Sequence, residues 1–200
     1  MKKVFCIVLA IAWSIGVFCQ PWSGPFGLKM GLTQKQLEAS GITLTEIGDN
    51  LFMASKVPNP HRDFSTYMLL VSPTSGLAKI LAISDDITTD SQGYKLRNEY
   101  EDIKSLLDSK YGESDETDFL MYGSIWSDAD DFMMALKLEE RYLECSWVDT
   151  GDVMKSNEIS TIGLKAEARD NYTGYLLLLY EFDNFSDYVD SVKEKDKDAF

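Results

Sequence analysis

The stretch Ser65–Ser84, STYMLLVSPTSGLAKILAIS, decides the fold class of this chain because it holds two strands and the turn that joins them. Residues 65–72 and 77–84 are rich in aliphatic side chains and lie on either side of a short polar segment, a pattern that predicts paired strands. The segment PTSG at 73–76 places Pro and Gly where a tight turn uses them. We therefore predict an antiparallel hairpin over 65–84.

The second strand of this hairpin has two different faces, because side chains alternate along a strand. Lys79 lies on one face with Leu81 and Ile83. Ile80 and Ala82 point the other way. One face thus carries a charge among aliphatic residues, whereas the other is apolar.

The rest of the chain supplies further strands. Alternating or continuous apolar patterns predict them at 50–57, 141–148, 159–168 and 174–182. The polar segment 169–174 is the turn that joins the last two. The run Tyr175–Phe182 contains no charged residue before Glu181, which is typical of a central strand with both faces covered.

A short helix precedes these strands, and both of its ends are encoded in the sequence. Thr33 is a good N-cap, and Gln36 three residues later completes a capping box. Gly41 supplies the left-handed position that ends the helix. The helix 34–40 is too short to be stable alone, so it must dock on another element. The alternating segment FGLKM at 26–30 is a short strand or a docking segment for this helix.

Two more helices are predicted in the middle of the chain. From 94 to 111 the apolar residues recur at intervals of three and four and trace one helical face, and a glycine follows. Residues 127–140 fit a helix with Ser127 as N-cap and acids at 128–131 in the first turn. A strand over 131–138 is the competing interpretation.

Helices and strands are segregated along the chain, which predicts an α+β fold: a mainly antiparallel sheet with two to three helices packed on it. The halves 26–85 and 93–183 both begin with a glycine-terminated helix and continue into hairpin strands, which leaves a degenerate two-fold repeat open. We assign 20–185 to a single α+β domain. Residues 186–200 form a charged C-terminal tail that we expect to fray.

Residues 1–19 have the composition of a secretory signal peptide. Lys2 and Lys3 form a basic start, and 4–12 is a compact apolar run. That run is short for a membrane anchor, which needs about 20 apolar residues. We therefore expect export to the envelope or periplasm of a bacterium, with no stable membrane insertion after cleavage.

The cleavage point has two alternatives, after Gly16 or after Cys19. A lipidated cysteine normally follows a small residue, and the residue before Cys19 is the large Phe18. We therefore do not expect a lipid anchor at Cys19. Cleavage after Cys19 would leave one cysteine, which cannot form an internal disulfide.

The chain is strongly acidic, with a formal net charge of −14. Loss of the signal peptide removes two lysines and no acid, which lowers the charge to −16. Such a surface repels nucleic acid and anionic lipid headgroups. It suits a basic protein partner, or simply solubility.

The sequence contains no local catalytic motif. His61, in NPHRDF, is the only histidine, so a Ser–His–Asp or Cys–His arrangement would have to use it. Its loop is rich in Pro and Asn, and we expect a surface residue. Cys145 shares one strand face with Leu143 and Trp147, which predicts a buried, inert thiol. We assign no catalytic residue, no cofactor-binding residue and no cofactor.

Metal binding is not indicated either. Zinc sites usually need several His or Cys ligands, and the mature chain has too few. The acidic segments 113–118 (ESDETD) and 128–131 (DADD) do not match a calcium loop. We expect a solvated loop for the first and helix-start acids for the second, and assign no metal ligand. A carboxylate pair for glycoside hydrolysis has no local motif, so a carboxylate-based hydrolase stays open.

The segment Gly31–Gly41, GLTQKQLEASG, resembles the helix start of small bacterial envelope domains of the SmpA/OmlA type. The β-lactamase-inhibitor-like fold has a related layout of helix on sheet. The resemblance covers 11 of 200 residues. This chain departs from the lipoproteins in its greater length and in the residue before Cys19, and no ligand residue carries over. As a whole the chain resembles an exported bacterial α+β protein.

From these observations we expect a non-catalytic exported binding protein that acts through a protein–protein surface. It would work in the manner of an inhibitor, an immunity protein or an envelope accessory factor, because a sheet with helices on it can present one open face. Two alternatives remain: a small-ligand carrier with an apolar cavity between helices and sheet, and the carboxylate-based hydrolase.

Overall fold

The computed structural model describes residues 22–148 and 151–197 and confirms the α+β class. Within them lie five α-helices and one nine-stranded sheet, in which all paired strands are antiparallel. The expected number of two to three helices was too low. None of the described helices is long and apolar enough to cross a membrane. The signal peptide predicted at 1–19 lies outside the described residues.

The nine strands form one curved sheet. They are β1 (Leu44–Gly48), β2 (Leu51–Ala54), β3 (Phe64–Ser72), β4 (Gly76–Ser84), β5 (Ile87–Thr88), β6 (Asp115–Leu120), β7 (Arg141–Val148), β8 (Ile159–Asp170) and β9 (Thr173–Phe182). Their order in space is β1-β2-β3-β4-β9-β8-β7-β6, and β5 pairs with β9. The β3–β4 hairpin is confirmed, and β9 lies in the interior of the sheet as predicted.

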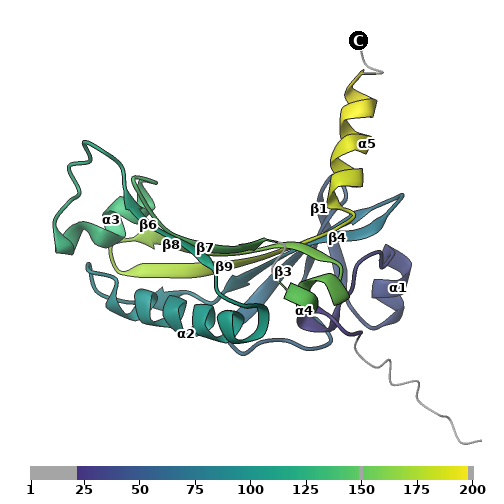
Figure 1. Cartoon of the computed structure of the whole chain (residues 1–200), viewed down its shortest axis with the longest axis horizontal. Coiled ribbons are helices and arrows are strands. Elements are labelled where there is room, and N and C mark those ends of the chain that lie inside the picture. The colour runs from purple at the N-terminus through teal and green to yellow at the C-terminus, as the bar shows by residue number, and fades with distance from the viewer. Residues whose placement is uncertain (1–21, 149–150, 198–200) are drawn as a thin grey trace, which may run out of the picture.

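Most helices lie on one side of the sheet. The five are α1 (Gln34–Ala39), α2 (Tyr94–Tyr111), α3 (Phe132–Lys137), α4 (Gly151–Ser156) and α5 (Phe185–Lys197). Figure 1 shows α1, α2 and α4 below the sheet, α3 at the end that carries β6 and β8, and α5 standing on the opposite side. The helix predicted over 94–111 is confirmed as α2.

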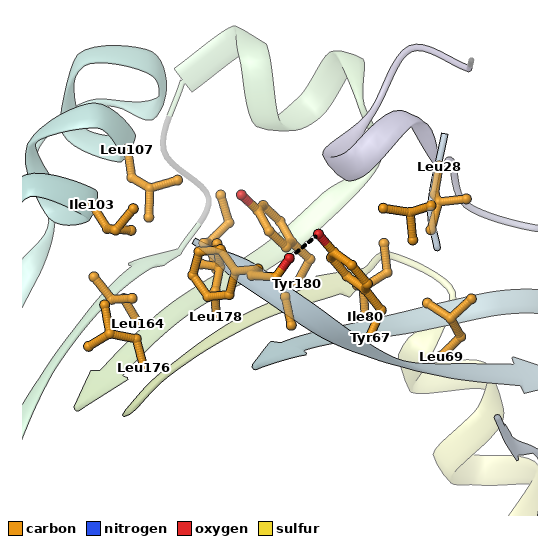
Figure 2. Close-up of a cluster of buried hydrophobic side chains, with 14 of the residues drawn as sticks. Leu28, Tyr67, Leu69, Ile80, Ile103, Leu107, Leu164, Leu176, Leu178 and Tyr180 are labelled. Atoms are coloured by element: carbon orange, nitrogen blue, oxygen red, sulfur yellow. Dashed lines mark hydrogen bonds between the residues drawn. The ribbon is translucent and has the colours of Figure 1, made fainter. Parts of the chain in front are cut away.

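The core fills the space between the sheet and the helices on its covered side. Figure 2 shows Ile103 and Leu107 of α2 facing Leu176 and Leu178 of β9. The indole Nε1–H of Trp147, a fully buried residue, donates to the Gly112 carbonyl at 2.8 Å and ties β7 to the end of α2. Burial of these large side chains is the main driving force that holds the helices on the sheet.

The segment before α1 docks on the sheet. Gly31 N–H donates to the Leu77 carbonyl at 3.0 Å, and Leu77 N–H donates to the Leu32 carbonyl at 2.8 Å. The Phe26 ring packs edge-on against Tyr67, with the centroids 4.9 Å apart. Of the two expectations for 26–30, the docking segment is therefore confirmed and the strand is not.

Both ends of α1 are also confirmed. Thr33 Oγ1 accepts a hydrogen bond from Gln36 N–H at 3.3 Å, and Gln36 Oε1 accepts one from Thr33 N–H at 2.9 Å. These two bonds are the predicted capping box. Gly41 has a φ of 89°, the left-handed conformation expected after the last turn.

The acidic segment 113–118 is not a loop as predicted, because most of it belongs to the edge strand β6. Acidic residues can occupy this strand because the side chains of Lys104 and Arg141 form ion pairs with two of them. Lys104 Nζ lies 3.4 Å from a Glu116 carboxylate oxygen, and Asp118 pairs with Arg141. Pairing with β7 therefore overrides the low strand propensity of Asp.

Residues 127–140 are helical only in part. The α-helix spans Phe132–Lys137, which rules out the competing strand over 131–138. Ser127 is not the N-cap, because a 3-10 turn at Ala129–Asp131 precedes the helix. Phe132, however, lies in the core as its apolar pattern predicts.

The charged tail is helical where we expected it to fray. Phe185, Tyr188 and Val189 recur at intervals of three and one, and they give α5 an apolar side that is half-buried.

Neither β1 nor β5 was predicted, because both are short and their segments are largely polar.

Candidate functional site

One face of the sheet is left open by the helices. Along β9, buried residues alternate with Tyr175, Leu177, Leu179 and Glu181, which are half-buried. The expectation that this strand is covered on both faces was therefore wrong. Figure 1 shows the sheet curving toward the uncovered side, with α5 standing at one end. We call this concave surface the open face.

An apolar band crosses the open face. The strand register places Met53, Met68, Leu81 and Leu179 side by side on β2, β3, β4 and β9. Neighbouring rows add further apolar residues, and we define the apolar band as Met53, Met68, Leu70, Leu81, Ile83, Leu177 and Leu179. The uncovered face of an antiparallel sheet usually carries polar residues. A contiguous apolar surface at this place is a feature of binding sites.

The band leads into a hollow that is lined in part by Gly163. The row that contains Leu179 continues to Gly163, Ser146 and Asp115 on β8, β7 and β6. The hollow has a volume of about 370 Å³, with Leu81, Leu177 and Leu179 on its apolar side and Glu144, Ser146 and Lys165 on its polar side. It lies on the open face, opposite the helices.

Gly163 lines this hollow without contributing a side chain to it. A Cβ atom added there would lie 3.7 Å from Leu179 Cβ, an ordinary van der Waals contact. Backbone geometry therefore does not demand glycine at position 163. An interior strand glycine of this kind often marks a place where a ligand or another chain approaches closely.

Two ion pairs border the apolar band. Lys79 Nζ lies 2.9 Å from Glu181 Oε1, and Lys165 Nζ lies 2.6 Å from Glu167 Oε1. Burial by itself would lower the pKa of Lys165, but the carboxylate of Glu167 outweighs this and raises it. Each lysine thus has a carboxylate partner, and the band between the two pairs is uncharged.

The band reaches the foot of α5. A second hollow of about 280 Å³ lies there, between Phe185 and Tyr188 on the helix and Met68 and Leu70 on the sheet. The Lys79 ammonium sits 4.9 Å from the centre of the Phe185 ring. The helix α5 therefore forms a wall at this end of the open face.

Cys145 is buried, as its spacing predicts. It lies 3% exposed in the core, on the strand face that it shares with Leu143 and Trp147. Burial raises the pKa of the Cys145 thiol to about 11. A thiol that stays protonated and sheltered at neutral pH is a poor nucleophile.

His61 lies on the loop before β3, as expected. Its Nδ1 is 3.6 Å from Asp63 Oδ2, and its ring is 5.9 Å from that of Phe64. Its side chain is partly exposed. None of its contacts within the described residues brings a serine or cysteine nucleophile to the imidazole.

The acidic segments do not form a metal centre in the part of the chain that the structure describes, where no group of three or more His, Cys, Asp or Glu could hold an ion. Two acids, Asp115 and Glu144, line the hollow on the open face, and neither forms an ion pair with another described residue. These two carboxylates are what a hydrolase at this site would have to use.

Comparison with known proteins assigns no family. No family model, no curated protein and no solved structure matches this chain. The resemblance of Gly31–Gly41 to envelope domains therefore stays a prediction.

Sequence reasoning missed this site, although one signal was present. Gly163 interrupts the strand ISTIGLKAEA at 159–168, and such a glycine marks an unusual position. The apolar band was invisible because its members come from β2, β3, β4 and β9. Only the register brings them together.

Proposed function

We propose that this chain is a non-catalytic, exported binding protein whose open face receives a protein partner. One observation carries the proposal: an apolar band on a concave, uncovered sheet face leads into a hollow above Gly163. An apolar side chain of the partner would fill this hollow. Burial of that side chain would contribute about 1.5–3 kcal/mol, as for other large apolar residues.

Charge favours a basic partner. The net charge of −14, or −16 without the signal peptide, steers a cationic protein toward this chain and keeps nucleic acid and anionic lipid away. The ion pairs Lys79–Glu181 and Lys165–Glu167 would stay at the rim, where they orient the partner more than they add affinity. If the predicted signal peptide at 1–19 directs export, the encounter takes place in a bacterial periplasm or envelope.

A small-ligand carrier is the second candidate. The hollow of about 370 Å³ lies within the range of ligand pockets, roughly 300–1,000 Å³. It differs from the expected carrier site, since it opens on the sheet face and not between helices and sheet. A carrier would therefore hold its ligand against Leu81, Leu177 and Leu179.

The experiment compares two glycine variants of the full chain. Gly163→Ile fills the hollow, and Gly48→Ile is the matched control on β1, where a Cβ atom would also make only an ordinary contact. Each is used for pull-down from bacterial envelope extract at low and moderate salt. We expect a salt-sensitive partner that Gly48→Ile retains and Gly163→Ile loses.

Other outcomes decide against the proposal. Retention of the partner by Gly163→Ile would show that the hollow is not part of the interface. Absence of a salt-sensitive partner, together with a small molecule released from the purified chain in native mass spectrometry, would favour the carrier. Hydrolase activity lost in Asp115→Asn or Glu144→Gln would favour an enzyme.

A further inference from the structure

A second apolar surface is exposed at the end of the sheet that carries β6. It is formed by the end of β6, the loop that follows and the residue after α3, and its members are Phe119, Met121, Tyr122, Ile125 and Leu138. We call these five residues the loop patch. Tyr122 is 104% exposed and Ile125 is 78% exposed, so neither contributes to the core. Figure 1 shows this loop rising at the end of the sheet that lies opposite α5.

The loop holds a defined shape. Met121 N–H donates to the Glu140 carbonyl at 2.7 Å, and Ser124 N–H donates to the Met121 carbonyl at 3.1 Å. Between them Gly123 has a φ of 83°, the left-handed conformation that this turn needs. Because the turn is already formed, less conformational entropy is lost when the loop patch binds.

Acids flank the segments of the loop patch in the sequence. Asp128 and Asp131 follow the loop, and Glu139 and Glu140 follow Leu138. None of these four carboxylates forms an ion pair with another residue in the described ranges, whereas the nearby Arg141 is engaged by Asp118. Two basic residues, Arg141 and the exposed Lys137, adjoin these acids in the chain, so the border of the apolar centre is acidic on balance.

This border selects the kind of partner. A second copy of the chain would bring the same acids against these, and an anionic bilayer would be repelled in the same way. A protein pocket with an apolar floor and a rim of Lys and Arg complements both parts of the surface.

We propose that the loop patch is an anchor that inserts into an apolar pocket rimmed by Lys and Arg on the partner protein. The inference rests on the proposed function, because the same basic partner would contact the open face and this loop. Tyr122 and Ile125 would supply most of the binding energy, since a few central apolar side chains usually dominate an interface.

The test uses two synthetic peptides that share the same Leu and Phe residues and carry either Lys or Glu at every other position. Each is titrated into the isotopically labelled full chain, and the backbone amide shifts are followed by NMR. We expect the Lys peptide to shift the amides of residues 119–126 and the Glu peptide to leave them unchanged. The double variant Tyr122→Ser/Ile125→Ser should bind the Lys peptide with an affinity that is lower by roughly ten-fold or more.

Two similarly exposed apolar residues provide the matched control. Leu106→Ser/Tyr172→Ser removes side chains that are each 60% exposed but lie outside the loop patch, and it should bind as the wild type does. Gly163→Ile should also retain the peptide. Suppose that Gly163→Ile loses the native partner, but the Lys peptide does not shift the amides of residues 119–126. This result would contradict the proposed role of the loop patch and would still support the proposed function of the open face.

The remaining outcomes are also decisive. Equal binding of both peptides, or of neither, would overturn the basic-pocket proposal. Shifts at residues 119–126 with zwitterionic phosphatidylcholine vesicles, in the absence of a Lys-peptide effect, would make the loop patch a membrane contact instead.

Discussion

Gly163 and Gly174 are strand glycines with opposite surroundings. Gly163 faces the hollow, and an added Cβ atom would meet nothing closer than 3.7 Å. Gly174 lies under α2, where an added Cβ atom would be 2.5 Å from Leu96 Cδ2 and 2.8 Å from the Glu167 carbonyl oxygen. The second position needs glycine for packing, whereas the first does not.

The corresponding alanine variants should therefore differ in stability. Gly174→Ala should lower the free energy of unfolding by about 1–3 kcal/mol, because a tightly packed site is overfilled. Gly163→Ala should leave it unchanged or raise it by about 0.5–1 kcal/mol, because alanine restricts the unfolded chain. Urea unfolding of both variants checks this, and equal effects at the two positions would contradict it.

Two buried tyrosines form a second matched pair. The buried Tyr100 hydroxyl faces the Cys145 thiol, a weak hydrogen-bond partner, whereas the Tyr67 hydroxyl donates to the Phe64 carbonyl at 3.0 Å. Tyr100→Phe should change the free energy of unfolding by less than about 0.5 kcal/mol, because a thiol is only a weak hydrogen-bond partner. Tyr67→Phe should lower it by about 1 kcal/mol, and a larger loss for Tyr100→Phe than for Tyr67→Phe in urea unfolding would contradict this order.

At the scale of elements, α1 depends on its cap. The helix has only six residues, so the capping box and docking must hold it. Thr33→Ala should cost about 1 kcal/mol and speed hydrogen exchange of the α1 amides. Thr45→Ala, on the exposed strand β1, is the control and should leave α1 exchange unchanged. Unaltered exchange in Thr33→Ala would mean that docking alone holds this helix.

The elements differ in how well sequence predicts them. The capping box of α1, the apolar stripe of α2 and the β3–β4 hairpin depend on residues close in the chain, and all three are confirmed. The edge strand β6 was mistaken for a loop because its acids disfavour a strand. Only tertiary contacts reveal that β7, Lys104 and Arg141 stabilise it there.

At the scale of the whole molecule, buried tyrosines tie stability to pH. Burial raises the pKa of Tyr67, Tyr100 and Tyr180 above their ordinary value of 10.0. In the folded chain these hydroxyls stay protonated at a pH where the unfolded chain would ionise them. Their stabilising contribution is therefore fully present below about pH 10 and is lost as the pH rises toward the folded values.

Alkaline unfolding measures this contribution. Each such tyrosine should lower the free energy of unfolding by about 1.4 kcal/mol for every pH unit above about pH 10. Urea unfolding between about pH 9 and 11 should show this decline. In Tyr180→Phe the slope of the free energy of unfolding against pH should be smaller by the contribution of one tyrosine. A slope that Tyr180→Phe does not change would show that this hydroxyl ionises in the folded chain.

The sequence by itself determined the α+β class, the helix over 94–111, the burial of Cys145 and the strong acidity, because each depends on local periodicity or composition. Tertiary structure alone decided that one sheet face stays open, that seven apolar residues from four strands form one band on it, and that a hollow lies above Gly163. The physical reason is strand register. Residues far apart in the chain become neighbours only when hydrogen bonding between strands fixes which side chains share a row and a face.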